Sequence, residues 1–447
     1  MRKVALVSAL FLTMSVGFAN PGQASFLVQM DLGPGAFMSD NVTYIGTIPI
    51  DSPGVAAAVR TVGNQRRLYV SGAKGLTIWD VTNPALPTPL GHYTLPHFQN
   101  ENMGVSADGS KAIISTDTFG VDRNGSTSNG VHILDTSNPA NIRRLGFVAS
   151  GNHTSMCPDP ACNYIYGSSG VIIDATNPAA PKLTGRRWGN GGHALNRDPS
   201  GLVISDSNPR LVLDVSDPAA PRVLSSGKPT VKTPDGLLQH NNVRTRALEW
   251  VPRDPLAPDY NDPTLRPGEL MIGNSESNVR PNCGGNAGGL SSWSMINFDK
   301  GEPIKQLQVF RPVNGNWVDG NPAVNALGCS GHWFTVRDIS PTTSLIAASW
   351  YEHGIRFIEV DAATGTFKQV GFFNPVVTEA GAAHWIDDRY VYSIDYARGI
   401  DIVRFDPAAE TPSEGEIQAS WLANLGAVGE QASLERYACR TSAADGT

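Results

Sequence analysis

Six of the nine histidines stand at corresponding positions of a repeated sequence pattern, each at the start of a β-rich run. His153 precedes Asp174 by 21 residues, and His193 precedes Asp214 by the same number. Neutral imidazole nitrogens are suitable ligands for copper, zinc and iron. If the starts of these runs meet at one place in the fold, they form a site for a transition metal or a small ligand. The six histidines are His97, His153, His193, His240, His332 and His384.

Charged side chains are expected beside these imidazoles. Four acidic residues end the second strand of their repeats, before a turn that opens on the same face as the histidines: Asp117, Glu276, Glu352 and Asp395. They would orient an imidazole through its second nitrogen or bind the ion themselves. Three arginines follow a histidine by four or five residues and are candidates for binding an anionic group. These are Arg197, Arg244 and Arg337.

A purely structural role for the histidines is the alternative hypothesis. One ancestral histidine, hydrogen-bonded between adjacent repeats, would have been copied by duplication and kept for packing. The two hypotheses differ in geometry, because imidazole nitrogens that converge on one point favour a metal. Nitrogens that spread around a channel favour the structural role, because they lie too far apart to bind one ion.

A recurring phrase predicts the elements that position these residues. It reads GLTIWDVTNPALP from Gly75, GVHILDTSNPA from Gly130, GVIIDATNPAAP from Gly170 and RLVLDVSDPAAP from Arg210, with weaker copies from Gly289, Gly354 and Gly399. The apolar β-branched run of each phrase predicts a buried strand, and the following Asp, Ser, Thr, Asn and Pro residues predict a turn. The aspartates of the four strong copies are 55, 39 and 40 residues apart, about the length of one four-stranded propeller blade.

The seven phrases predict an all-β fold, a seven-bladed β-propeller of four-stranded blades over residues 42–407. The last blade stops at Asp406 without an outer strand, and the segment Tyr44–Ile50 resembles the missing one. We therefore expect the N-terminal strand to close the ring, which removes both free sheet edges. Long insertions are expected in blade five, at about 253–289. An open solenoid is disfavoured because no repeat resembles a polar cap.

The phrases resemble the LVIVD-repeat family of exported bacterial β-propeller proteins. GVIID at 170–174 and LVLDV at 211–215 are closest to the pentapeptide that defines the family. The resemblance extends over roughly residues 42–407 and implies a repeat architecture. It does not imply a particular reaction, because the family has no common one.

The N-terminus and the cysteines favour an exported protein. Arg2 and Lys3 precede a short apolar run, so residues 1–24 are expected to be a removed signal peptide, followed by an extension over 25–41. The compartment is then the periplasm or the exterior, where disulfides persist. We expect the pairs Cys157–Cys162 and Cys283–Cys329, with Cys439 left over. A metal site made of His153, Cys157 and Cys162 is the alternative, but its spacing matches no common zinc pattern.

Composition excludes several classes of function. The 447 residues carry a net charge of −7, and no basic run exists that would neutralise a row of phosphates, so nucleic acid is not an expected partner. No later stretch is apolar enough to span a membrane in the mature protein. We find no nucleophile elbow, no phosphate-binding glycine loop and no helical metalloprotease motif. The tail, 408–447, has one segment that suggests a short helix.

Three functional hypotheses follow. The first is an exported propeller that binds a metal ion, either copper, zinc or iron, or a small ligand at a face lined by histidines. The second is a metal-dependent oxidase or hydrolase at that face. The third is a scaffold for a protein partner, in which the histidines are structural.

Overall fold

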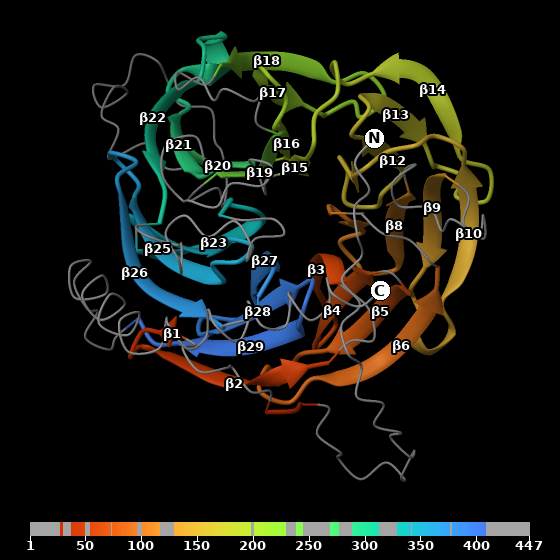
Figure 1. Ribbon diagram of the computed structural model, residues 1–447. Coiled ribbons are helices and arrows are strands. Elements are labelled where there is room, and N and C mark those ends of the chain that lie inside the picture. Colours follow the sequence, from red (N-terminus) through yellow and green to blue (C-terminus); the bar gives the residue numbers. More distant parts are fainter. Residues whose placement is uncertain are drawn as a thin grey trace, which may run out of the picture.

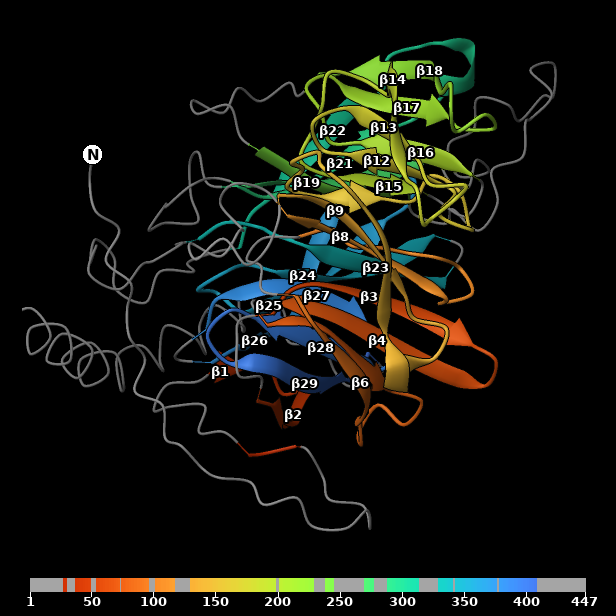
Figure 2. The ribbon, with the colours of Figure 1, turned by 90° about the vertical axis from the view of Figure 1, so that its right-hand side faces the viewer.

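The computed structural model describes residues 27–29, 37–49, 54–72, 74–95, 101–116, 129–197, 201–228, 238–244, 269–276, 288–312, 329–340, 342–375 and 378–407; for 238–244 it describes the backbone alone. These residues form seven antiparallel sheets around one central axis, as Figure 1 shows. From the side, inner strands such as β15 and β16 run roughly along this axis (Figure 2). The protein is therefore a seven-bladed β-propeller, as the repeats predict.

The first four blades are made of consecutive strands. Blade 1 contains β3 (Gly54–Val62), β4 (Gln65–Gly72), β5 (Gly75–Asp80) and β6 (Thr88–Thr94). Blade 2 contains β7 (Gly104–Val105), β8 (Lys111–Thr116), β9 (Gly130–Asp135) and β10 (Arg143–Val148). Blade 3 contains β11 (Ser155–Met156), β12 (Tyr164–Gly167), β13 (Val171–Asp174) and β14 (Lys182–Arg187). Blade 4 contains β15 (Leu195–Arg197), β16 (Leu202–Ser205), β17 (Arg210–Asp214) and β18 (Arg222–Gly227).

Blade 5 is also made of consecutive strands, whereas blades 6 and 7 each include a strand from the N-terminal region. Blade 5 contains β19 (Leu238–Arg244), β20 (Leu270–Glu276), β21 (Leu290–Ser294) and β22 (Lys305–Phe310). Blade 6 contains β23 (Phe334–Ser340), β24 (Thr343–Ser349), β25 (Ile355–Asp361) and β26 (Phe367–Asn374). Blade 7 contains β27 (Ala380–Trp385), β28 (Tyr390–Asp395) and β29 (Gly399–Phe405), completed by β2 (Val42–Ile48). Two short 3₁₀ turns, Pro139–Asn141 and Phe298–Lys300, are the helical elements of these described residues.

An N-terminal strand closes the ring, consistent with the sequence. Strand β2 pairs antiparallel with β29, from Val42 opposite Phe405 to Ile48 opposite Ile400. The strand begins two residues earlier than expected. A second short strand, β1 (Phe37–Met38), pairs with β26 and gives blade 6 a fifth strand. No repeat phrase marks this strand, so the sequence did not predict it.

The repeated aspartates cap the turns that end the third strands. One carboxylate oxygen of Asp80 accepts hydrogen bonds from the backbone N–H of Thr82, at 2.9 Å, and from its hydroxyl, at 2.6 Å. Asp135 and Asp174 bind Ser137 and Thr176 in the same way. The phrase therefore encodes a turn held by one side chain, which explains why it recurs in one form.

Apolar residues of adjacent sheets pack face to face around the ring. Ile133 of blade 2 and Ile173 of blade 3 are fully buried in one shared cluster. Tyrosines add polar links between neighbours: the hydroxyl of Tyr166 donates to the carbonyl of Pro218, and that of Tyr392 donates to the carbonyl of Pro84. Each blade thus fixes the angle of the next, which makes the centre of the ring a rigid framework.

The expected disulfide between Cys157 and Cys162 is present. Cys329 is also in a disulfide, while its expected partner, Cys283, lies outside the described residues. The same holds for the expected signal peptide, for Cys439 and the tail 408–447, and for most of the predicted insertion, although β20 lies within that range. Across the described ranges, no helix has the length and apolar character needed to cross a membrane.

Candidate metal centre

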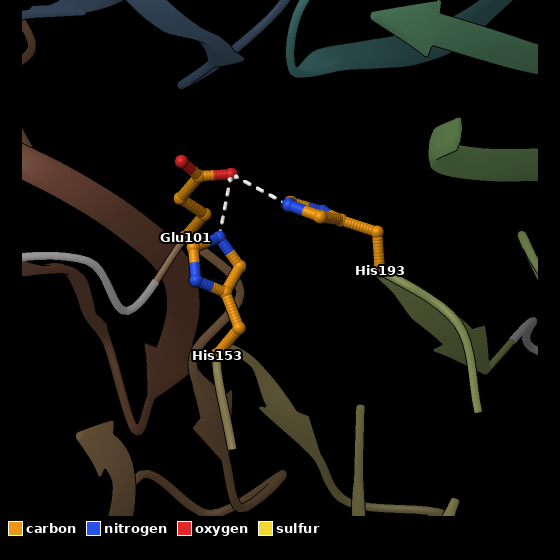
Figure 3. A group of neighbouring side chains, drawn as sticks. All are labelled: Glu101, His153 and His193. Carbon is orange, nitrogen blue, oxygen red and sulfur yellow. Dashed lines mark ion pairs between the residues drawn. The ribbon is translucent and has the colours of Figure 1, made fainter. Parts of the chain in front are cut away.

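Four side chains from four blades meet at the centre of the ring. The Nε2 atoms of His153, His193 and His332 lie 3.5, 3.4 and 3.4 Å from one carboxylate oxygen, Oε2 of Glu101. Figure 3 shows the rings of His153 and His193 pointing toward this oxygen from two directions. The donor atoms of Glu101, His153 and His193 all lie within 4.8 Å of one another. The convergence expected of a metal site is therefore present, around a carboxylate.

The four residues hold equivalent places in their blades. His153, His193 and His332 each stand two residues before the innermost strand, which is β11, β15 or β23. Glu101 stands three residues before β7, the innermost strand of blade 2. Because innermost strands line the axis of a propeller, residues just before them at the same end face one another. The repeat itself thus builds the site.

The spacing of the donor atoms fits a bound ion. Charge-assisted hydrogen bonds between nitrogen and oxygen have lengths of about 2.7–2.9 Å, which is shorter than the three separations around Glu101. Two ligand atoms at ~2.1 Å from one tetrahedral ion are ~3.4 Å apart, by simple geometry from typical zinc distances. The observed separations of 3.4–3.5 Å between the Nε2 atoms and Oε2 of Glu101 match those of two ligands of one ion.

His332 is oriented as a ligand. Its Nδ1 atom is hydrogen-bonded to the backbone carbonyl of Gly381 in blade 7, so Nδ1 carries the proton. In the neutral ring, the lone pair of Nε2 then faces the carboxylate of Glu101. A lone pair beside a carboxylate is repulsive unless a proton or a metal ion lies between them. Metal-bound histidines usually donate their other ring N–H to a carbonyl or carboxylate in this manner.

The electrostatics of the cluster are those of a desolvated ion site. Burial alone would raise the pKa of Glu101, but the nearby imidazoles of His332, His153 and His193 hold it well below its usual value. Burial would lower the pKa of His332, yet the carboxylate of Glu101 reverses this and raises it. The carboxylate of Glu101 therefore stays negative in a dry environment and favours a positive charge beside it, either a proton on an imidazole or a metal ion.

Two tyrosines and a second glutamate border the cluster. The ring of Tyr351 packs on His332, with centroids 4.6 Å apart, and its hydroxyl donates to Glu276. Tyr396 lies 6.3 Å from both rings. Burial, reinforced by the charge of Glu276, raises the pKa values of both phenols well above the usual range. The phenols are thus hydrogen-bond donors, unsuited to act as general bases at neutral pH.

Backbone contacts between blades hold the cluster in place. Thr154, which follows His153, donates its hydroxyl to the backbone carbonyl of His193. Asn102, which follows Glu101, donates its amide to the carbonyl of Leu195 at 2.9 Å. Each of these bonds joins one ligand-bearing segment to another, so the site is organised before any ion binds.

The structure brings together three of the six predicted histidines. His97 lies outside the described residues, and the structure gives only the backbone of His240, where it pairs with Asn274 across β19 and β20. His384 is the fifth residue of β27, and in this part of the chain it makes no ion pair with Glu101. Burial lowers the pKa of His384 to about 4. His384 thus lies within its innermost strand, whereas the other three histidines stand two residues before theirs.

The two predicted arginines whose side chains are described, Arg197 and Arg337, do not join the cluster. Arg197 is exposed at the end of β15, four residues or about 13 Å of strand beyond His193. Arg337 donates to the carbonyl of Asp388 and stacks on Trp385 at 5.3 Å. Only the backbone of Arg244 is described. Arg337 therefore has a structural role along its strand, and Arg197 lies exposed away from the cluster.

The predicted acidic residues are divided among several roles. Glu276 borders the site through its bond to Tyr351. Asp395 caps the turn after β28, accepting from the backbone N–H groups of Ala397 and Arg398. Glu352 is buried in the turn between β24 and β25, and Asp117 lies outside the described residues.

Glu101 is the member of the cluster that the sequence did not reveal. It occupies in blade 2 the place that a histidine occupies in blades 3, 4 and 6, but the segment between β8 and β9 is longer there. This length shifts the distance to the repeat aspartate, which was the measure that located His153 and His193. The number of residues from this position to the second strand of the blade would have located Glu101. The alternative thiolate site with His153 is excluded, because Cys157 and Cys162 are bonded to each other.

Comparisons with known protein families identify one repeat of this chain. The sequence profile described as the LVIVD repeat matches residues 54–94, which are blade 1. No curated protein matches this chain in sequence.

Solved structures with a similar fold include three at low identity. The β-propeller domain of Cps50 (Swd1) from Myceliophteria thermophila is 10% identical, with a TM-score of 0.49 over 82% of this chain and 100% of that one. YCF48 from Cyanidioschyzon merolae is 12% identical, with a TM-score of 0.47 over 83% and 100%. A putative 6-phosphogluconolactonase from Bacteroides fragilis is 11% identical, with a TM-score of 0.47 over 77% and 88%. This chain is a seven-bladed β-propeller that contains an LVIVD repeat.

Proposed function

We propose that this propeller binds one divalent transition metal ion on its axis, through Glu101, His153 and His193, with His332 as the fourth ligand. The observation that carries the proposal is the approach of three Nε2 atoms, from three blades, to one carboxylate oxygen at 3.4–3.5 Å. Three imidazoles and one carboxylate suit copper, zinc or iron, since these ions take borderline nitrogen donors.

The alternative is a structural cluster in which the imidazoles simply hydrogen-bond the carboxylate. Two features favour the ion. The separations exceed those of charge-assisted hydrogen bonds, and Nδ1 of His332 donates to a backbone carbonyl, as metal-bound histidines usually do. A buried charge cluster without an ion is also costly to desolvate and adds little stability.

A metal-dependent oxidase or hydrolase is the second candidate. The compact group of donor atoms has three members, Glu101, His153 and His193. Catalytic metal sites commonly have three protein ligands and one open position. If His332 does not bind the ion, this position would accept water or a substrate beside Tyr351. Retention of metal by His332→Ala, together with activity that depends on that metal, would support this candidate.

We also propose that the protein works outside the cytoplasm. The disulfide between Cys157 and Cys162 supports this, because structural disulfides persist in oxidising compartments. Secretion of the full chain from its native host, with a mature N-terminus near residue 25, is the expected result. A cytoplasmic location with reduced cysteines would contradict it.

Metal analysis tests the proposed function. The purified full chain is stripped with a chelator, incubated separately with copper, zinc and iron, and desalted. We expect about one ion per chain for at least one of them, as a single four-ligand site requires. The double variant His153→Ala/His193→Ala should retain none. A wild-type chain that binds none of the three ions would overturn the proposal.

A further inference from the structure

Two ionisable side chains are almost completely buried beside the candidate metal centre. Asp206, just after β16, is 2% exposed, and Arg210, the first residue of β17, is 1% exposed. Desolvation of a buried pair of opposite charges commonly costs as much as their attraction returns. The packing of blade 4 alone does not explain them, since an apolar pair would fill the same volume at lower cost.

Asp206 holds the segment that bears His193. Its Oδ2 atom accepts a hydrogen bond of 2.6 Å from the backbone N–H of Ala194, the residue after His193. The backbone of His193 also interacts with this carboxylate. In blade 3, by contrast, the hydroxyl of Ser168 accepts from the backbone N–H of His153 at 2.9 Å. A neutral hydroxyl therefore fixes the equivalent segment in blade 3, so this contact alone does not require a carboxyl group.

Arg210 extends the contact into blade 5. Its guanidinium is attracted to Asp206, lies over the ring of Trp293 at 5.0 Å and donates to the backbone carbonyl of Asn274 at 3.2 Å. Gly273 makes room for it, because a Cβ atom there would lie 2.8 Å from the guanidinium carbon. The residues of β20 thus accommodate this particular side chain.

Asn274 completes the path to blade 6. It is fully buried, and its side-chain amide donates to the backbone carbonyl of His332. Hydrogen bonds join Asp206 to the segment of His193, Arg210 to Asn274, and Asn274 to His332, while Asp206 and Arg210 are linked by electrostatic attraction. The residues lie between two imidazoles that approach the same oxygen of Glu101.

We propose that Asp206, Arg210 and Asn274 are positioning residues of the metal centre, which set the separation of His193 and His332 across blade 5. The inference rests on the proposed function and adds the residues that give the site its geometry. Outer partners of metal ligands typically change affinity by about 10–100-fold when they are removed. The three residues therefore act on metal affinity and ligand geometry, beyond their part in stability.

Cobalt(II) is the probe for this proposal, because its visible absorption reports coordination geometry. The full chain is compared with Asn274→Ala and with Asn374→Ala, a matched control. Asn374 is equally buried but lies at the end of the outer strand β26. We expect Asn274→Ala to bind cobalt about 10–100-fold more weakly, with an altered spectrum, while Asn374→Ala binds as the wild type does. If Asn274→Ala does not fold, Asn274→Asp keeps the volume and removes the donor.

A second pair of variants separates positioning from stability. Asp206→Asn keeps an oxygen that accepts from Ala194, whereas Asp206→Ala does not. Asp206→Asn should bind cobalt more tightly than Asp206→Ala, by about tenfold. Wild-type affinity and spectrum in Asn274→Ala and Asp206→Ala would overturn the positioning role while leaving the metal site intact. A wild-type chain that binds no cobalt, zinc, copper or iron would overturn both proposals.

Discussion

The Nε2 atom of His332 lies 3.4 Å from Oε2 of Glu101, although the two residues belong to blades 6 and 2, three blades apart around the ring. Only an innermost strand can bring its first residues to the axis, so this contact depends on the closed ring. Because the ring is closed by β2, the candidate metal centre depends on a strand more than fifty residues before Glu101 in the chain.

Loss of one imidazole should abolish tight metal binding. We expect His193→Ala to bind zinc at least ~100-fold more weakly than the wild type, since even an outer partner costs about 10–100-fold. His384→Ala is the control, because this histidine also lies on an innermost strand but does not approach Glu101. Competition with a chromophoric chelator measures both affinities. Equal losses in the two variants would show that the effect is not specific to the cluster.

Ring closure should contribute strongly to stability. Ile48 of β2 is 1% exposed and packs in a cluster with residues of blades 1 and 7. Ile48→Ala should lower the free energy of unfolding by about 2–5 kcal/mol, as expected for a buried aliphatic residue. Ile339→Ala, the same change at an exposed position, should cost under about 0.5 kcal/mol. Urea unfolding measures the difference, and similar values for both variants would contradict the closure by β2.

The short disulfide should stabilise the contact between blades 2 and 3. The loop it closes is anchored on blade 2, because the carbonyl of Pro160 accepts from the backbone N–H of Ala107 at 2.7 Å. Loop-closure entropy predicts a loss of about 2 kcal/mol in the free energy of unfolding for Cys157→Ser/Cys162→Ser. Urea unfolding of the oxidised wild type and the double variant checks this value. An unchanged midpoint would mean that the loop is held without the bridge.

Asp395 should make stability depend on pH. Burial, with the charge of Asp401, raises the pKa of Asp395 to about 6, above the 3.8 of an ordinary aspartate. The folded chain then binds more protons than the unfolded chain between these values. This group therefore stabilises the fold fully below pH ~4, and the stabilisation is lost as the pH rises through ~6. Two pKa units correspond to at most about 3 kcal/mol.

Asp395→Asn removes this titration. The free energy of unfolding of the variant, relative to the wild type, should increase as the pH rises from about 4 to about 7. Asp361→Asn is the control, because hydrogen bonds from the side chain and backbone of Thr364 lower the pKa of Asp361. Its difference from the wild type should change mainly below pH ~4. A difference for Asp395→Asn that stays constant from pH 4 to 7 would contradict the raised pKa.

The architecture was predictable because the repeat phrase encodes a local structure. Asp80, Asp135 and Asp174 each hold one turn by short-range hydrogen bonds, so the phrase marks the third strand of a blade wherever it occurs. Strand β1 has no such signal, since its pairing with β26 joins segments more than 330 residues apart. Long-range pairing of a two-residue strand leaves no periodicity in the sequence.

The candidate site was predictable only in part. His153, His193 and His332 share one offset from the innermost strand, which the distance to the repeat aspartate reveals for the first two. That measure fails for Glu101, where the residue type differs and a longer segment intervenes. It also admits His384, which lies four residues further along its strand than the start of β27. The position of a residue within its blade therefore has to be counted from the paired strands, and the pairing is known only from the structure.

X-ray absorption spectroscopy of the zinc-loaded full chain tests the central claim most directly. The account predicts one firmly bound ion with four nitrogen or oxygen ligands at ~2.0–2.1 Å and the outer-shell scattering of imidazole rings. The imidazole signal should fall in His193→Ala and stay unchanged in His384→Ala. A hydrated ion without imidazole scattering, or a chain that keeps no zinc after desalting, would contradict the account.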